Sequence, residues 1–180
     1  MRVISGSRKG RKLVRIEGER IRPTSDRTKE AIFNILGHSI RQARVLDLFA
    51  GTGALGIEAL SRGADHAVFI DLDCDIVRKN ILHCRFEAGS SVICHDIINQ
   101  PLPESLKGNS FDVVFIDPPY KSGYIEATLG KEEFINLLAP GCTIIAEHSC
   151  KESLQLNPSG LDIFRQKKYS KTIISFITKG

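Results

Sequence analysis

The sequence predicts an α/β fold with a mostly parallel sheet that helices cover on both faces. Apolar strand-like runs alternate with helical segments through the middle of the chain, an order typical of a parallel sheet. Near the C-terminus only three residues separate two strand-like runs. That connection is too short for a crossover, so we expect the last pair to be antiparallel. The chain has 180 residues, of which 42% are hydrophobic, so it can bury a core of its own.

The N-terminal residues predict a short basic hairpin. The runs Val3-Ile4 and Leu13-Val14-Arg15-Ile16 flank the stretch SGSRKGRK, a pattern typical of two short strands around a glycine-containing turn. We therefore expect residues 1–24 to form a basic β-hairpin arm and residues 25–180 to form the main domain.

The main domain alternates helices and strands. Ser25 or Asp26 can cap a first helix that runs through about Leu36. Strand-like runs follow at 44–49, 67–71, 91–95, 111–116 and 142–147, with helical candidates between them at 54–62, 75–86 and 124–138. The runs at 161–168 and 172–177 form the antiparallel pair.

Composition narrows the class of protein. No run is long enough to span a membrane, and the N-terminus lacks the apolar stretch of a signal peptide, so we expect a cytoplasmic protein. The five cysteines are odd in number and form no CxxC pair. We therefore expect neither a disulfide framework nor a zinc or other metal site, and interpret the cysteines as ordinary buried thiols.

Charge is distributed unevenly along the chain. Residues 1–29 hold ten Lys or Arg against three acidic residues, a net charge of +7, and because the whole chain carries +4 the remainder carries −3. This split is typical of a basic arm that binds a polyanion, although a solvated basic tail is the alternative. The candidate RNA-binding residues are Arg8, Lys9, Arg11 and Lys12 at the tip of the hairpin, with Arg22 behind them.

Four predicted strands end in residues suited to a ligand, and ligands of open α/β sheets bind at the carboxyl ends of the strands. The first strand holds Asp47 and leads into the glycines Gly51, Gly53 and Gly56, which permit a tight turn and a close approach of the backbone to a ligand. The next ends are Asp71, whose carboxylate can accept both hydroxyls of a ribose, then Asp96, and finally the sequence DPPY at 117–120. This edge predicts a pocket for a nucleoside-like cofactor beside a second planar ligand.

The glycine pattern by itself also matches the dinucleotide fingerprint G-x-G-x-x-G, so an NAD-dependent oxidoreductase is an alternative. However, a chain this short has no second nucleotide-binding half, and hydride transfer has no use for DPPY. A catalytically silent RNA-binding module would explain the basic arm but leave the pocket idle. Methyl transfer to a nucleic acid explains the nucleoside-like pocket, the DPPY sequence and the basic arm together.

The motifs together resemble a known family. DPPY at 117–120, combined with VLDLFAGTGALGIEALSRGA at 45–64, resembles the S-adenosylmethionine-dependent methyltransferases of exocyclic amino groups. MRVISGSRKGRKL and RPTSDRTKEAIFNIL resemble more specifically the RsmD family, bacterial enzymes that methylate N2 of a guanine in 16S ribosomal RNA.

The resemblance implies a Rossmann-like class I methyltransferase fold. Its seven-stranded sheet would be mostly parallel with an antiparallel last strand, and an N-terminal β-hairpin would extend it. It also implies S-adenosyl-L-methionine as cofactor and 16S rRNA as partner, either free or within a partly assembled small ribosomal subunit. We expect a monomer. Methylation of adenine N6 on RNA or DNA is the alternative, because a DPPY site can present either amine.

The resemblance also implies roles by position. The loop 47–53 would hold the methionine end of the cofactor, Asp71 the ribose and Asp96 the adenine. The expected cofactor-binding residues are Asp47, Phe49, Gly51, Gly53, Asp71, Leu72, Asp96, Ile97 and Asp117. Three alternatives stay open at this stage: Asp73 could replace Asp71, Asp47 could serve only loop amides, and Asp96 could cap a helix.

The DPPY turn carries the expected catalytic residues. Pro118 and Pro119 lack backbone donors and fix φ, so the strand must stop at Asp117 and the turn is stiff. The Asp117 carboxylate and the Pro118 carbonyl can accept the two N–H bonds of a base amine, while Tyr120 stacks on the base. Packing of Tyr120 in the core is the alternative.

Overall fold

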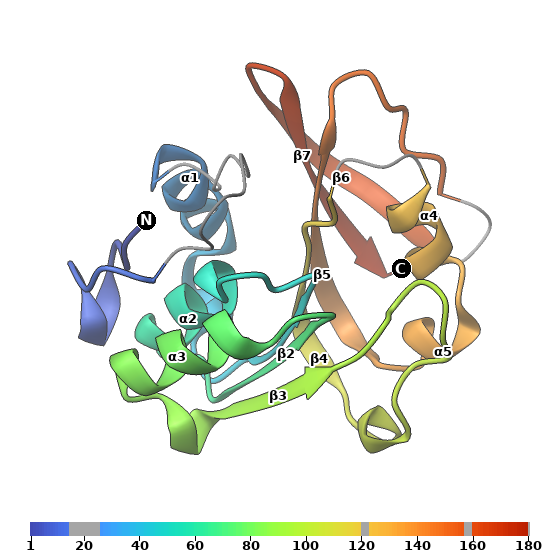
Figure 1. Cartoon of the computed structure of the whole chain (residues 1–180). Coiled ribbons are helices and arrows are strands. Elements are labelled where there is room, and N and C mark those ends of the chain that lie inside the picture. The colour runs from blue at the N-terminus through green and yellow to red at the C-terminus, as the bar shows by residue number, and fades with distance from the viewer. Residues whose placement is uncertain (15–25, 120–122, 157–159, 180) are drawn as a thin grey trace.

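The computed structural model describes residues 1–14, 26–119, 123–156 and 160–179. These residues form a seven-stranded sheet with the strand order β3-β2-β1-β4-β5-β7-β6 (Figure 1). Its strands are β1 (Arg44–Leu48), β2 (His66–Asp71), β3 (Ser90–Cys94), β4 (Phe111–Ile116), β5 (Leu138–Ser149), β6 (Leu161–Tyr169) and β7 (Thr172–Lys179). Strands β1 to β5 are parallel where they pair, and β7 runs antiparallel to both β5 and β6, which confirms the predicted sheet.

Helices cover both faces of this sheet. Helices α1 (Asp26–Leu36), α2 (Ala54–Ser61) and α3 (Asp75–Cys84) lie on one face, and α4 (Tyr124–Leu129) and α5 (Glu132–Ile135) lie on the other (Figure 1). Strand residues alternate between the two cores. Phe115 belongs to the core under α1 to α3, whereas its neighbours Val114 and Ile116 belong to the core under α4 and α5.

The helix expected at 124–138 is wrong in its C-terminal half. The structure ends α4 at Leu129, gives α5 only four residues, and begins β5 at Leu138. Gly130 caps α4, and Leu138 pairs with Phe111 at the start of β4. The apolar residues near 134–138 suit a helix by spacing, but pairing with β4 decides their conformation.

The predicted N-terminal hairpin is present in residues 1–14, reduced to a single antiparallel bridge between Arg2 and Lys12. The backbone N–H of Val3 donates to the carbonyl of Arg11 at 2.9 Å, and a short 3₁₀ turn spans Gly6–Arg8. The part of the second predicted strand beyond Val14, and the domain boundary near residue 24, lie outside the described residues.

This segment packs against the helices of the main domain. Val3 and Leu13 are buried in the core under α1 to α3. Gly6 has a φ of +80°, and a Cβ atom there would stand 1.7 Å from the backbone oxygen of Ser61 at the end of α2. Only glycine permits this approach. The described part of the arm therefore shares one core with the rest of the chain.

In the part of the chain that the structure describes, no helix has the length and apolar character needed to span a membrane.

Candidate active site

The register of the sheet brings the predicted strand ends to one edge. Leu48 of β1 pairs with Ile70 of β2 and with Ile116 of β4, and Ile116 pairs in turn with Ala146 of β5. The residue that follows each of these four therefore stands at the same level of the sheet. These residues are Phe49, Asp71, Asp117 and Glu147. Glu147 is the member of this row that sequence reasoning missed.

Asp47 bonds the helix that follows the glycine loop, which is the segment 49–53 between β1 and α2. Its side chain is 2% exposed and accepts a hydrogen bond at 2.9 Å from the backbone N–H of Gly56 in α2. Burial raises the pKa of Asp47 to about 7, against the lowering effect of that hydrogen bond. Asp47 thus accepts from an amide in the first turn of α2 rather than from the loop, and its contact with the cofactor stays a prediction.

The raised pKa of Asp47 predicts a pH-dependent stability. The folded chain holds this proton more tightly than the unfolded chain, whose aspartates titrate near 3.8, so the contribution of Asp47 is full below about pH 4 and is lost as the pH rises through about 7. Asp47→Asn keeps an acceptor for Gly56 without a charge. We expect the variant to exceed the wild type in unfolding free energy by about 1–3 kcal/mol at pH 8, with the gap closing toward pH 5.

Denaturant midpoints at the two pH values measure this difference. Asp65→Asn, at an exposed site, is the control and should show no such change with pH. A constant gap between Asp47→Asn and wild type across this range would contradict a buried, titrating Asp47.

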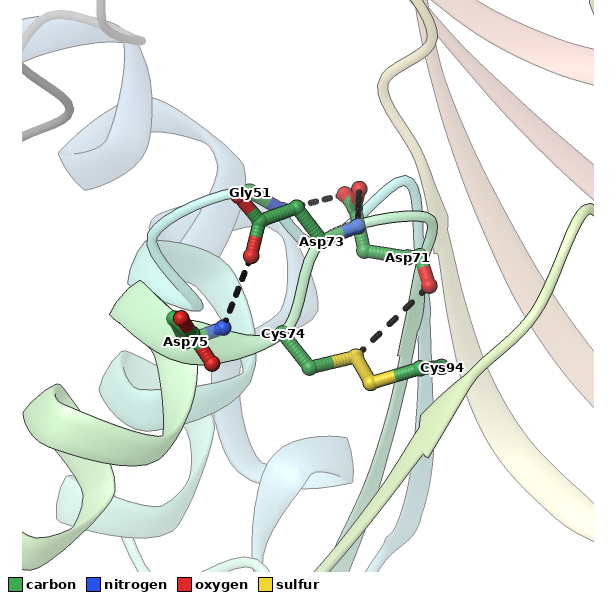
Figure 2. The surroundings of a disulfide bond; sticks show 6 residues. All are labelled: Gly51, Asp71, Asp73, Cys74, Asp75 and Cys94. Atoms are coloured by element: carbon green, nitrogen blue, oxygen red, sulfur yellow. Dashed lines mark hydrogen bonds between the residues drawn. A yellow bond between two sulfur atoms is a disulfide. The ribbon is translucent and has the colours of Figure 1, made fainter.

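Asp71 forms a hydrogen bond with the backbone of the glycine loop. Its Oδ2 accepts a hydrogen bond at 2.7 Å from the backbone N–H of Gly51, which has a φ of +53° (Figure 2). Asp73 instead accepts from the backbone N–H of Asp75 in the first turn of α3, at 3.0 Å. The structure therefore gives Asp71 the loop and Asp73 the helix start, which favours Asp71 as the pocket residue.

Two apolar side chains stand beside this loop. Leu72, directly after Asp71, is 72% exposed. Phe49 has a φ of +58°, uncommon for a bulky residue, and its ring stacks on that of Tyr124 at 6.2 Å between centroids. Phe49 thus connects the loop after β1 with the start of α4.

Asp96 shapes the turn after β3. Its carboxylate accepts hydrogen bonds from the backbone N–H groups of Ile98 and Asn99 and from the Asn99 side chain. The Asn99 side-chain bond, followed by the backbone bonds, lowers the pKa of Asp96. Ile97 is 2% exposed and packs in the core under α4 and α5. No helix begins in the described residues 97–103 that follow Asp96, so the helix-cap alternative is wrong and Asp96 instead closes a turn. Contact of either residue with adenine stays a prediction.

Two cysteines at this edge correct the sequence interpretation. Cys74 and Cys94 form a disulfide with their Cα atoms 5.7 Å apart, and Cys74 lies beside Asp71 (Figure 2). Cys94 pairs with Asp71 across β2 and β3, and Cys74, three residues after Asp71, is the N-cap of α3. The expectation of unpaired thiols is therefore wrong for these two. Counting cysteines and CxxC motifs cannot detect partners that only strand pairing brings together.

The DPPY turn adjoins a shallow pocket on the β5 side. Asp117 is half-buried, Pro118 is buried and Pro119 is exposed, while Tyr120 lies outside the described residues. The pocket is lined by Pro118, Pro119, Gly123, Tyr124, Ile125, Glu126, Glu147, His148, Glu152 and Leu154. The turn thus separates the glycine loop and Asp71 on one side from a pocket of planar and acidic side chains on the other.

The candidate RNA-binding residues divide into two kinds. The Arg8 guanidinium donates to the Cys84 carbonyl at 2.7 Å and lies over the Phe86 ring, and Arg11 donates to the carbonyl of His83. These arginines satisfy carbonyls at the C-terminal end of α3. Lys9 and Lys12 are exposed, and Arg22 lies outside the described residues.

Asn80 is a further residue that sequence reasoning missed. It is fully buried in α3, accepts from the backbone N–H of Val14 at 2.7 Å, and donates to the carbonyl of Thr52 at 2.9 Å. It therefore connects the end of the N-terminal segment to the glycine loop. The helical spacing could have indicated its burial, because Asn80 lies on the same helix face as the buried residues Val77 and Cys84.

Comparisons with known proteins identify the family of this chain. The family model described as "Conserved hypothetical protein 95" matches residues 1–178. Ribosomal RNA small subunit methyltransferase D of Escherichia coli is 35% identical over 168 residues, covering 93% of this chain and 84% of that protein. The enzyme of the same name from Haemophilus influenzae is 36% identical over 176 residues, covering 93% and 88%. The chain belongs to the RsmD family.

Solved structures confirm the fold expected of an RsmD family member. The yhhF protein of Escherichia coli superposes with a TM-score of 0.85 at 32% identity, covering 99% of this chain and 97% of that one. An O-methyltransferase family protein from Burkholderia thailandensis, 16% identical, covers 85% of this chain and 59% of that one with a TM-score of 0.60. The sheet is thus the Rossmann-like class I methyltransferase sheet, with its antiparallel strand β7.

Proposed function

We propose that this protein transfers a methyl group from S-adenosylmethionine to the exocyclic N2 of a guanine in small-subunit (16S) ribosomal RNA. The observation that carries the proposal is the position of the DPPY turn, between the glycine loop with Asp71 and the pocket under Glu147. The relatives named rRNA small subunit methyltransferase D support the coarser statement, methyl transfer to rRNA. Guanine N2 is the finer step of the proposal.

The loop side of the turn fits the proposed cofactor. Asp71 offers a carboxylate at the end of β2, Leu72 offers an exposed apolar surface beside it, and the backbone around Gly51 is held open by the Asp71 hydrogen bond. A carboxylate suits ribose hydroxyls, and an apolar surface suits the face of adenine. S-adenosylmethionine would supply the activated methyl group.

The chemistry at the turn concerns the lone pair of the base amine. N2 of guanine is a poor nucleophile because its lone pair is delocalised into the ring. The Asp117 carboxylate and the Pro118 carbonyl would accept its two N–H bonds, draw the nitrogen toward sp³ geometry and localise that lone pair. The same acceptors stabilise the positive charge that develops on nitrogen, and the proton leaves afterwards. The two prolines keep the acceptors rigid, and Tyr120 would stack on the base.

A transfer assay tests the proposed function. Purified protein, S-adenosylmethionine with a tritiated methyl group, and rRNA or small-subunit particles from cells lacking the gene should yield tritium in N2-methylguanosine after nucleoside analysis. Label in N6-methyladenosine would replace the guanine proposal with the adenine alternative. Absence of label from every rRNA and particle would overturn methyl transfer to rRNA altogether.

Asp71 carries the first binding prediction. Asp71→Ala removes a charge-assisted acceptor and releases the amide of Gly51. We expect it to weaken binding of S-adenosylmethionine by about 1–3 kcal/mol, roughly 10- to 100-fold. Calorimetry measures the affinity, with Asp73→Ala as the neighbouring control that should bind nearly normally. Equal losses in both variants would argue against a ribose contact at Asp71.

Lys9 and Lys12 carry the RNA prediction. Both are exposed on the basic segment, whereas Arg8 and Arg11 are committed to carbonyls of α3, so only the lysines can be neutralised without loosening the fold. Replacing both lysines by Gln should weaken RNA binding and reduce its slope against log salt by about 0.7–0.9 per lost phosphate contact.

Lys167→Gln with Lys168→Gln removes the same charge from β6, the edge strand of the sheet. Binding of rRNA across a salt series, with cofactor titration alongside, compares the two double variants. If both change the salt slope equally, the arm contributes only net charge and RNA recognition lies elsewhere.

A further inference from the structure

Glu147 occupies a distinctive place beside the proposed catalytic turn. It follows Ala146 on β5 as Asp117 follows Ile116 on β4, and Ala146 pairs with Ile116. Neighbouring strands lie about 4.8 Å apart, so the two acidic residues stand side by side at the carboxyl edge. Phe115 lies two residues before Asp117, and Ile145 lies two residues before Glu147. Phe115 and Ile145 pair and belong to the same core, so the two strands present the same face at this level.

The strand order places the predicted cofactor residues and Glu147 on opposite sides of the DPPY turn. Asp96, Asp71 and Gly51 follow β3, β2 and β1 on one side of the turn, and Glu147 follows β5 on the other. A cofactor held by the first group would place its methyl donor at Asp117 from the β1 side. The accepting base must then approach Asp117 from the β5 side, where Glu147 lines the pocket with Pro118 and Pro119.

The chemistry of this pocket suits the donor edge of a base. Glu126 and Glu152 join Glu147 among the lining residues that the structure describes. Among those residues His148, whose Nε2 is bound to the Ser175 hydroxyl at 2.8 Å, is the one group that can carry a positive charge. The three described carboxylates favour hydrogen-bond donors over phosphate. Guanine presents two adjacent kinds of donor, N1–H and the N2 amine, whereas adenine presents an acceptor at N1 beside its N6 amine.

Resting on the proposed function, we infer that Glu147 is the specificity-determining residue that selects guanine, its carboxylate accepting the N1–H while Asp117 and Pro118 hold the N2 amine. Side chains that start from two neighbouring strands can converge on two neighbouring donors of one base edge. An adenine placed with its N6 amine at Asp117 would turn the N1 lone pair toward the Glu147 carboxylate. Two acceptors facing each other repel, so this base is rejected.

The test changes one donor on the substrate and one acceptor on the protein. The position methylated in the transfer assay is rebuilt by ligation in small-subunit rRNA with either guanine or 2-aminopurine, which keeps the N2 amine but has a bare acceptor at N1. Single-turnover rates are measured for wild type, Glu147→Gln and the exposed control Glu87→Gln. Because 2-aminopurine also lacks O6 in every comparison, only the ratio of the two rates is compared between proteins.

The expected result is a change in selectivity rather than in folding. Wild type and Glu87→Gln should prefer guanine by roughly 10- to 100-fold, the worth of one charge-assisted hydrogen bond. A glutamine amide can either accept from N1–H or donate to a bare N1, so Glu147→Gln should lower this preference at least tenfold. Binding of S-adenosylmethionine, measured separately, should be unchanged in Glu147→Gln.

Two other outcomes are distinguishable. If wild type methylates guanine and Glu147→Gln keeps the same preference over 2-aminopurine, Glu147 does not read N1 and the inference fails while the proposed function stands. If wild type methylates no guanine of the rRNA at N2, the proposed function fails and takes this inference with it.

Discussion

Asp117→Ala should lower the rate of methyl transfer by a factor of about 10² or more while leaving the affinity for S-adenosylmethionine nearly unchanged. The carboxylate of Asp117 stands at the carboxyl edge between the glycine loop and the pocket, where the base amine would be held. Its role as an acceptor grows as positive charge develops on the amine, so its loss costs most in the transition state. Single-turnover rates and calorimetry on the same variant separate the two effects.

Two further variants sharpen this prediction. Asp117→Asn keeps one oxygen acceptor without the charge and should retain more activity than Asp117→Ala. Asp112→Asn changes an exposed acid near the other end of β4, which accepts from the backbone of Arg44, and should transfer methyl groups at a near-normal rate. Near-normal turnover by Asp117→Ala would force the acceptor mechanism at the turn to be abandoned.

The sheet was predictable because its signals are local. Each strand of the parallel part is a compact apolar run bounded by polar or turn-forming residues. The link before Thr172 is so short that it permits only an antiparallel pair. The carboxyl edge followed from topology, since parallel strands must end together. For the same reason the sequence alone predicts Asp71 and Asp117 at one edge of the sheet.

The remaining features depend on contacts between distant segments. The Cys74–Cys94 disulfide requires the pairing of β2 with β3, and the early start of β5 requires the pairing of Leu138 with Phe111. Arg8 was expected at an RNA surface because it lies in a basic run, yet the fold turns it onto a carbonyl at the end of α3. Charge in a sequence shows how many cations a segment has but not which of them the fold uses.

Glu58 is the strongest example of such a hidden partner. In sequence it reads as an ordinary acid in the helix GIEAL, but the structure buries it completely. Its two oxygens accept from the backbone N–H groups of Ile4 and Ser5, at 2.7 and 3.0 Å. They also form ion pairs with Lys29 at 3.3 Å and Arg62 at 2.8 Å.

Removal of Glu58 should therefore destabilise the fold strongly. Lys29 is 1% exposed, and burial lowers its pKa while the Glu58 carboxylate opposes that shift. Without Glu58 the ammonium loses its buried counter-charge. We expect Glu58→Gln to lower the unfolding free energy by about 3–5 kcal/mol, which for a chain of this size corresponds to a drop of roughly 6–20 °C in melting temperature.

Lys29→Met provides the matched control, because it leaves Glu58 with Arg62 and both backbone amides. We expect this variant to lose less stability than Glu58→Gln, and the double variant to recover part of the loss, since no unpaired ammonium remains. The pH dependence has a definite sign. A Lys29 pKa lowered in the fold means that the unfolded chain binds the proton more tightly, so the stability of Glu58→Gln should rise with pH up to about 10.5.

Urea unfolding of the four proteins between pH 7 and 10 measures the coupling between the two side chains. Additive losses in the double variant would show that the two charges do not depend on each other. A coupling energy of several kcal/mol between Lys29 and Glu58 would instead show that this buried ion pair stabilises the attachment of the N-terminal segment to α2. The same segment carries Lys9 and Lys12, and its Val14 bonds Asn80 of α3, which also bonds Thr52 in the glycine loop. Its attachment at Glu58 therefore positions the exposed lysines relative to the proposed catalytic edge.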